Sequence, residues 1–468
     1  MRWLTLILLI SVVSGYAGEF SNSFWVWHRD HKLSEREIKT LESGGVSRVF
    51  WHVGSWEWLG GDQTFSGSEP PENAAGDEIE VVPVLRIEAG AEQVESKEAR
   101  ASFLKLATNF VAKTKPSALQ IDYDCPDRLL PVYQQLLAEL RTAIAPTELS
   151  ATALAGWARL DSISGFKGSV DWLAPMFYDL WPDEAVDVLA GKIRPLADPE
   201  ATELIEAWTA CPVPWEAGLA NFARVTLFAE DGKSKGHFPN WPWDAVSFHP
   251  ALQIVGEPSP GVTLLRATQP LVIRSVEINS DSLLAARIPD RDVLAQQREQ
   301  SQKSGARGVI WFRLPGTKVP TGLTSSDVLA LGSEEEIEIN LDFQNPKFNL
   351  KNSGVRDLPL RISGRHGDQD RGYQLEIDAS AVARFDEAGA GDFVLVRGHI
   401  EPDSDEPIPV RIPSATRLTF WLSHLSAGDE LESGFVSLKR GSTVSDLRWR
   451  LDGGDWRKFS EMSDEDPP

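Results

Sequence analysis

Two carboxylates stand two residues apart at the end of an apolar strand pattern, Ser117 to Asp124, which reads Ser-Ala-Leu-Gln-Ile-Asp-Tyr-Asp. Residues two apart on a strand share a face, so Gln120, Asp122 and Asp124 are expected to point the same way. An unpaired buried carboxylate is costly, so such a pair indicates either a solvent-filled site or a set of hydrogen bonds. If parallel strands surround this one, we expect the chemistry of the protein here.

Eight short apolar runs alternate with helical patterns along the first two thirds of the chain. The strands are expected at Ser23 to Arg29, Val46 to Trp51, Glu78 to Glu88, Ser117 to Asp124, Leu149 to Trp157, Val170 to Asp179, Pro214 to Phe222 and Gly308 to Arg313. The clearest helix is expected over Asp127 to Ile144, where leucines recur at helical spacing. This alternation predicts an α/β fold, a parallel (β/α)8 barrel of the TIM type, over residues 18–333.

Three other segments interrupt or follow this pattern. The interval after the seventh strand is too long for one helix, so we predict an insertion at about residues 223–288. From residue 334 short alternating runs appear without helical period, and they predict a smaller all-β, sandwich-like domain over 334–462, followed by an acidic tail at 463–468. The stretch Gly54 to Gly76, rich in Gly, Pro, Ser and acids, is expected to be a long loop.

The N-terminus predicts export. A basic start, an apolar run from Trp3 to Val13 and the small residues Gly15 and Ala17 are typical of a secretory signal, here residues 1–17. The run is too short for a permanent membrane anchor, so we expect a periplasmic or extracellular protein without one. Export permits a bridge between the two cysteines, Cys125 and Cys211, but the sequence leaves that pairing open.

The charge balance restricts the partners. With 46 Lys and Arg against 69 Asp and Glu, the net charge is -23, which disfavours nucleic acid and other polyanions. His28 and His31 have a spacing seen in metal ligands, but no further His or Cys falls nearby, so we predict no metal and no other cofactor. The oligomeric state stays open.

In a barrel of this kind, the active site gathers at the C-terminal ends of the strands. The candidate catalytic residues at those ends are Glu88, Asp122, Asp124, Tyr178 and Asp179, and the candidate substrate-binding residues are Trp27, His28, Arg29, His52, Arg86, Trp157, Met176, Asn221, Trp311 and Arg313. Acids, a tyrosine and tryptophans around one mouth indicate a glycosidase or a sugar-binding site, because aromatic faces stack on the apolar faces of sugars.

Two of these segments carry a resemblance to known families. Gln-Ile-Asp-Tyr-Asp at 120–124 and Pro-Met-Phe-Tyr-Asp at 175–179 are similar to the strand-four Asp-x-Asp and strand-six Met-x-Tyr-Asp signatures of the family 18 glycoside hydrolases, the chitinase clan. Together with Phe-Trp-Val-Trp-His-Arg, Ser-Ala-Thr-Ala-Leu-Ala-Gly-Trp and Trp-Phe-Arg-Leu-Pro, they resemble an uncharacterised bacterial family, the domain of unknown function family 3142. The resemblance covers about Ser23 to Pro315 and implies a (β/α)8 barrel that binds or cleaves a carbohydrate.

One departure from the chitinase pattern matters. Its general acid is a Glu two residues beyond the second Asp, and with Asp124 as that Asp the position holds Pro126. Asp124 could take the acid role if burial raised its pKa, with Asp122 holding it and Tyr178 and Asp179 orienting a substrate group. Glu88 could instead be an acid or a nucleophile in a different pair.

Structural roles are the alternative for the same residues. Asp122 and Asp124 could be a pair held by Arg86 or Arg313, and Tyr178, Met176, Trp157 and Trp311 could fill the core. The sequence therefore leaves two main hypotheses: an exported glycoside-hydrolase-like enzyme, or a glycan-binding protein that keeps the cleft without the proton donor. A structural or surface-assembly role for the C-terminal β domain is a third.

Overall fold

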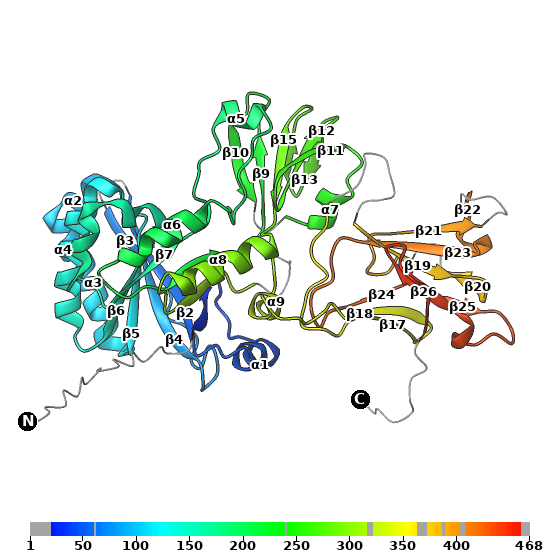
Figure 1. Cartoon of the computed structure of the whole chain (residues 1–468), viewed down its shortest axis with the longest axis horizontal. Coiled ribbons are helices and arrows are strands. Elements are labelled where there is room, and N and C mark those ends of the chain that lie inside the picture. Colours follow the sequence, from blue (N-terminus) through cyan, green and yellow to red (C-terminus); the bar gives the residue numbers. More distant parts are fainter. Residues whose placement is uncertain are drawn as a thin grey trace, which may run out of the picture.

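The computed structural model of the chain describes residues 20–59, 62–238, 241–315, 322–362, 372–385, 389–401 and 408–459. The predicted signal, residues 1–17, and the predicted acidic tail, residues 463–468, lie outside the described residues. Figure 1 shows a barrel with helices at one end of the molecule, an inserted sheet beside it, and a β-sandwich at the other end.

Eight parallel strands form the barrel, as the sequence predicts. They are β1 (Ser21–Val26), β2 (Arg48–Leu59), β4 (Glu80–Glu88), β5 (Ala118–Asp122), β6 (Glu148–Leu154), β7 (Trp172–Met176), β8 (Ala217–Ala220) and β16 (Gly308–Phe312). The sheet is closed because β1 pairs with both β2 and β16. Side chains such as Trp25, Phe50, Val84, Trp172 and Ile310 fill its interior, so the barrel is a packed core with a site only at its end.

Helices cover the outside of the barrel. They are α1 (Glu35–Ser43), α2 (Ala91–Glu95), α3 (Lys97–Thr114), α4 (Leu130–Ile144), α6 (Ala201–Ala207), α8 (Arg291–Lys303) and α9 (Ser325–Leu329), with short 3-10 turns η1 (Asp127–Leu129), η2 (Ala155–Arg159), η3 (Asp161–Phe166) and η4 (Trp208–Ala210). α5 (Ala185–Leu189) instead packs on the inserted sheet. α1 begins in a capping box, in which Ser34 accepts from the Glu37 backbone N–H and the Glu37 carboxylate accepts from the Ser34 N–H. Between β6 and β7, the two 3-10 turns η2 and η3 take the place of the α-helix expected in a βα unit.

The loop predicted over Gly54 to Gly76 is wrong in its first half. β2 continues to Leu59 and pairs antiparallel with β3 (Asp62–Gly67), so a hairpin extends beyond the barrel rim. Trp56 explains the continuation, because its ring is buried against Phe103 of α3 at 5.4 Å between centroids. The apolar contact and the ladder hydrogen bonds outweigh the turn-forming composition of the stretch.

Between β8 and α8 the chain forms a second sheet. Its order is β10 (Ser234–Phe238), β9 (Arg224–Phe228), β15 (Leu283–Arg287), β12 (Val262–Ala267) and β11 (Leu252–Ser259), all antiparallel. The hairpin β13 (Leu271–Ile273) and β14 (Val276–Ile278) and the helix α7 (Trp243–Ser247) accompany it. Val225, Trp241, Trp243, Leu265 and Leu284 give this sheet a core of its own.

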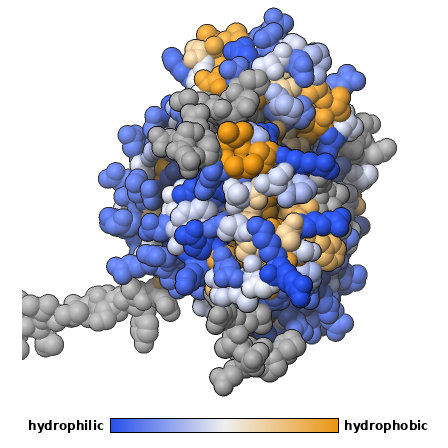
Figure 2. Space-filling view, turned by 90° about the vertical axis from the view of Figure 1, so that its right-hand side faces the viewer, coloured by the Kyte–Doolittle hydropathy of each residue, from blue (hydrophilic) through white to orange (hydrophobic). Residues whose placement is uncertain are grey.

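The C-terminal part is all-β, which confirms a barrel followed by a smaller β domain. One antiparallel sheet orders β22 (Ile408–Val410), β21 (Leu395–Ile400), β23 (Arg417–Leu422), β19 (Tyr373–Asp378), β26 (Arg448–Leu451) and β27 (Arg457–Lys458); the others are β17 (Ile339–Gln344), β18 (Lys347–Asn352) and β24 (Glu430–Glu432), and β20 (Val382–Phe385) with β25 (Val436–Leu438). Turns η5 (Ile412–Ser414) and η6 (Val444–Asp446) connect strands. Phe348, Leu375, Phe420 and Trp449 form their shared core. The end seen in Figure 2 is mostly hydrophilic, with apolar side chains in small groups.

Candidate functional site

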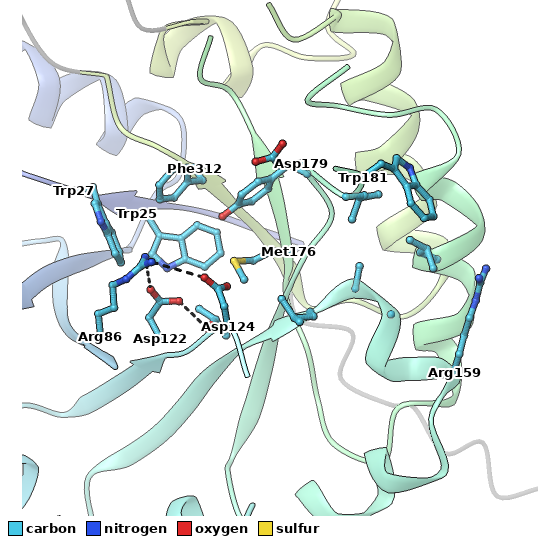
Figure 3. A pocket seen from close by; sticks show the side chains of 17 residues that line it. Trp25, Trp27, Arg86, Asp122, Asp124, Arg159, Met176, Asp179, Trp181 and Phe312 are labelled. Atoms are coloured by element: carbon cyan, nitrogen blue, oxygen red, sulfur yellow. Dashed lines mark hydrogen bonds and ion pairs between the residues drawn. The ribbon is translucent and has the colours of Figure 1, made fainter. Parts of the chain in front are cut away.

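The C-terminal ends of the barrel strands open into a cavity of about 600 Å³. Figure 3 shows the Arg86 guanidinium facing Asp122 and Asp124 from one side, with Trp25 and Trp27 near them and Trp181 and Arg159 at the opposite end. The lining residues are Trp25, Trp27, Arg86, Asp122, Asp124, Thr152, Leu154, Ala155, Gly156, Arg159, Met176, Tyr178, Asp179, Leu180, Trp181, Leu204 and Phe312. Seven of the residues expected from the sequence therefore share one cavity: Trp27, Arg86, Asp122, Asp124, Met176, Tyr178 and Asp179.

The inner face of β5 leads from the barrel core to this cavity. Gln120 is fully buried, and its side chain accepts a hydrogen bond from Trp25 Nε1 (2.7 Å) and donates one to Ser150 Oγ (3.3 Å). Asp122 is 5% exposed, whereas the side chain of Asp124 is 61% exposed. The alternation predicted from the sequence thus places a buried carboxylate and an accessible one in succession.

Asp122 is held on both sides of its carboxylate. Thr152 Oγ1 donates to Asp122 Oδ1 at 2.8 Å, and Arg86 Nη1 lies 3.1 Å from Asp122 Oδ2. Thr152 is itself fixed, since its oxygen accepts from the Tyr123 backbone N–H at 3.1 Å. Burial, which outweighs the attraction of Arg86, raises the pKa of Asp122 to about 6, and the neighbouring Asp124 charge acts in the same direction.

Arg86 joins three carboxylates. Besides Asp122, its Nε lies 2.9 Å from Glu88 Oε1, and its Nη2 lies 3.7 Å from Asp124 Oδ2. Glu88 follows Arg86 by two residues on β4, but it does not line the cavity. The structural alternative stated from the sequence, a pair held by Arg86, therefore describes a contact that exists, and any chemistry of Asp124 must operate beside this guanidinium.

The position at which the chitinase pattern would have its general acid lies outside the cavity lining. Pro126 follows β5 and precedes η1, and it does not line the cavity. Asp124, two residues past the end of β5, lines the cavity together with Asp122.

Aromatic rings form the walls near the carboxylates. Tyr178 and Phe312 stack at 5.5 Å between centroids, Phe312 meets Trp25 edge-on at 6.0 Å, and Trp27 stacks on His52 at 4.4 Å. Burial, reinforced by the charges of Asp122 and Asp124, raises the pKa of Tyr178, so its hydroxyl keeps its proton at neutral pH. The walls suit a ligand with apolar faces and hydroxyl groups.

Asp179 lines the cavity, but its carboxylate is engaged. Both oxygens accept from Arg224 of β9, at 2.5 and 2.7 Å, in a bidentate ion pair. A carboxylate held in this way orients its surroundings and is poorly placed to attack a sugar. Met176, two residues before Tyr178, supplies apolar surface to the same wall.

Eight of the expected residues lie outside the cavity lining: His28, Arg29, His52, Glu88, Trp157, Asn221, Trp311 and Arg313. Trp157 and Trp311 are fully buried, the first stacked on Phe166 at 5.5 Å and the second donating to Asn22 at 3.3 Å. Asn221 donates to the Leu323 carbonyl oxygen at 3.0 Å. A ring or amide buried in this way has no face for a ligand.

The remaining polar residues support the rim. Arg29 pairs with Glu37 at 2.8 Å and donates to the Pro315 carbonyl oxygen. Burial lowers the pKa of His52 to about 4, so the ring that backs Trp27 is neutral at neutral pH. Burial also lowers the pKa values of His28 and Arg313. Cys125 and Cys211 are both free thiols, which answers the pairing left open by the sequence.

Ten lining residues were not among the candidates: Trp25, Thr152, Leu154, Ala155, Gly156, Arg159, Leu180, Trp181, Leu204 and Phe312. Strand alternation would have found some of them, since Trp25 lies two residues before Trp27 and Thr152 two after Ser150 on the inner faces of β1 and β6. Trp181 and Leu204 come from a loop and a helix, for which no such signal exists.

Within the described ranges, no group of three or more His, Cys, Asp or Glu side chains is arranged to hold a metal ion. None of the helices described is long and apolar enough to cross a membrane.

Residues 77–174, from just before β4 into β7, match the model of the family described as Domain of unknown function (DUF3142), which confirms the resemblance over that part of the chain. A search of curated proteins found no match.

Among solved structures, catalytic domain 2 of a Group II chitinase from Ostrinia furnacalis is similar over 63% of this chain and 90% of its own, with 12% identity and a TM-score of 0.41. A glycoside hydrolase family 18 N-acetylglucosaminidase from Paenibacillus barengoltzii is similar over 63% and 95%, with 11% identity and a TM-score of 0.42. A chitinase-like agglutinin from Robinia pseudoacacia is similar over 64% and 96%, with 14% identity and a TM-score of 0.41.

Proposed function

We propose that this chain is an exported, glycoside-hydrolase-like protein that binds an oligo- or polysaccharide in the cavity and cleaves it with Asp124 as the proton donor. The observation that carries the proposal is the succession, at and just after the end of β5, of a buried, hydrogen-bonded Asp122 and an accessible Asp124, both of which line an aromatic-walled cavity. A cavity of about 600 Å³ is within the ordinary size range of ligand sites. The export part of the proposal rests on the N-terminal sequence alone.

The roles follow from the positions of the groups. Asp124 lines the cavity with an accessible carboxylate, 61% exposed, so we assign it as the proton donor; the burial on which the sequence made this role depend would have to come from the ligand that covers it. Asp122, whose pKa burial raises to about 6, can hold or share a proton behind it. The Tyr178 hydroxyl, which stays protonated at neutral pH, can donate a hydrogen bond to a ligand oxygen.

A glycan-binding protein without catalysis is the second candidate function. One observation favours it: Arg86 lies within ion-pair distance of Glu88, Asp122 and Asp124 together, which is the arrangement expected of carboxylates held in a structural charge cluster. Both candidates place the ligand in the same cavity, and they differ only in whether a bond is broken.

Replacing Trp27 by alanine tests the cavity as the binding site. We expect roughly tenfold weaker binding of any glycan bound by the wild type, because a stacked ring contributes on the order of 1 kcal/mol beyond its buried area. Calorimetry on the best ligand from an oligosaccharide screen measures the change. Trp456→Ala, in the sandwich, is the matched control and should bind like the wild type; a loss in that variant instead would place the ligand on the sandwich.

A further inference from the structure

The loop between β7 and α6 carries the far end of the cavity. Leu180 and Trp181 line it there, and Trp181 is 41% exposed. Figure 3 shows Trp181 at the end of the cavity away from Trp27 and the carboxylates. A ligand that reaches Trp181 must therefore extend well beyond the carboxylates.

One arginine of the inserted sheet contacts this loop both before and after α5. Arg287, at the end of β15, is 2% exposed. Its Nη2 donates to Asp183 Oδ1 at 2.5 Å, and its Nε donates to the Arg194 carbonyl oxygen at 2.8 Å. Its third group, Nη1, donates to Thr226 Oγ1 at 2.6 Å and so ties the guanidinium to β9. Figure 1 shows α5 beside the inserted sheet.

A second arginine adds another fixed point. Arg224 is paired with Arg287 in the ladder between β9 and β15, and it holds Asp179 through the bidentate ion pair. Trp181 lies in sequence between Asp179 and Asp183. The residues Asp179 and Asp183, which flank this tryptophan, are thus both paired with arginines of the inserted sheet.

The Trp181 ring is also supported from its own loop. The Arg194 guanidinium lies over the ring at 5.7 Å and is itself held by Glu200 at 2.8 Å and Asp198 at 3.3 Å. The Arg194 carbonyl oxygen is the group that Arg287 contacts. Arg287 therefore fixes both the start of the segment and the residue that contacts the ring.

We propose that Arg287 is a positioning residue for the ligand: through Asp183 and Arg194 it sets Trp181 as a distal stacking site, so the inserted sheet determines how well long oligosaccharides bind. This inference rests on the proposed function. Its particular consequence is a dependence on ligand length, because a short ligand held near Asp124 does not reach Trp181.

The test compares ligands of two and six units, taken from N-acetylglucosamine, glucosamine and glucose oligomers, in wild type, Arg287→Lys, Arg287→Met and Trp181→Ala. We expect both Arg287 variants to bind the six-unit ligand roughly two- to tenfold more weakly and the two-unit ligand unchanged. The double variant with Trp181→Ala should lose no more than Trp181→Ala alone. Arg266→Met, an exposed arginine on β12 of the same sheet, is the matched control.

Equal losses for both lengths, additive losses in the double variant, or unchanged binding would each overturn the proposal. Arg287→Lys keeps the charge that balances Asp183 and serves if Arg287→Met does not fold. Hydrogen exchange over residues 180–194 gives a readout without ligand: faster exchange in Arg287→Lys supports the positioning role, and unchanged exchange rejects it. A wild type that binds none of the oligomers would count against the proposed function, while the exchange result would still decide the role of Arg287.

Discussion

Asparagine in place of Asp124 should abolish most of the release of reducing ends from a cleaved glycan while the dissociation constant stays nearly unchanged. A positioned acid or base contributes about 10²- to 10⁴-fold to rate, and we expect a loss of that size. Asparagine has nearly the same shape as aspartic acid, so the cavity keeps its walls. The measurement pairs a reducing-end assay with calorimetry on the same ligand.

Asp127→Asn is the control for this substitution. Asp127 is an exposed acid three residues further on, in η1, and it does not line the cavity. The control should cleave at the wild-type rate. Unchanged cleavage by Asp124→Asn would reject Asp124 as the proton donor. Binding without cleavage by the wild type would instead establish the second candidate function, a glycan-binding barrel.

The sequence predicted the barrel because its strands are apolar runs bounded by charge and turn residues. Each of the eight expected runs overlaps one barrel strand, and all but one of the runs end within about three residues of the strand end; β2 continues to Leu59, well past its expected end at Trp51. Since parallel strands in a barrel end at one face, the placement of Asp122, Asp124, Arg86 and Tyr178 in a single cavity followed from the fold alone.

Two tryptophans near the ends of strands were wrongly expected to contact a ligand. On β16 the side chains that face inward are Ile310 and Phe312, so Phe312 lines the cavity and Trp311 packs outside. Strand alternation places Trp311 and Phe312 on opposite faces of β16, but the sequence alone does not show which of the two faces points into the barrel. Trp157 lies beyond β6 in η2, where strand alternation no longer applies, and it became a core residue.

Contacts between segments that are far apart in the chain could not be predicted from the sequence. Asp179 was expected to orient a substrate group, yet its partner is Arg224, 45 residues away on a sheet that the barrel pattern does not contain. The Arg287 contacts with Asp183 and Arg194 join residues 104 and 93 positions apart in the chain. Such pairs depend on how the insertion sits on the barrel, which local patterns do not encode.

Asp122→Asn should make the protein more stable at pH 8, and the gain over wild type should grow by roughly 2 kcal/mol between pH 4 and pH 8. Burial raises the pKa of Asp122 to about 6 from an ordinary value of 3.8, so the folded state favours the protonated acid. The stability contributed by that protonated form is complete below pH 3.8, falls as the pH rises toward 6, and is absent above it.

Asparagine resembles the neutral acid at every pH, so the variant escapes this loss. Urea unfolding at pH 4, 6 and 8 measures the difference, and Asp124→Asn is the control, since an exposed side chain at the same mouth should change stability by less than about 0.5 kcal/mol. A constant difference between Asp122→Asn and wild type over this range would mean that Arg86 and Thr152 compensate fully for the burial of the charge. Asp122 would then be an ordinary ionised partner of Arg86 throughout this range, and it could not hold a proton behind Asp124 at mildly acidic pH.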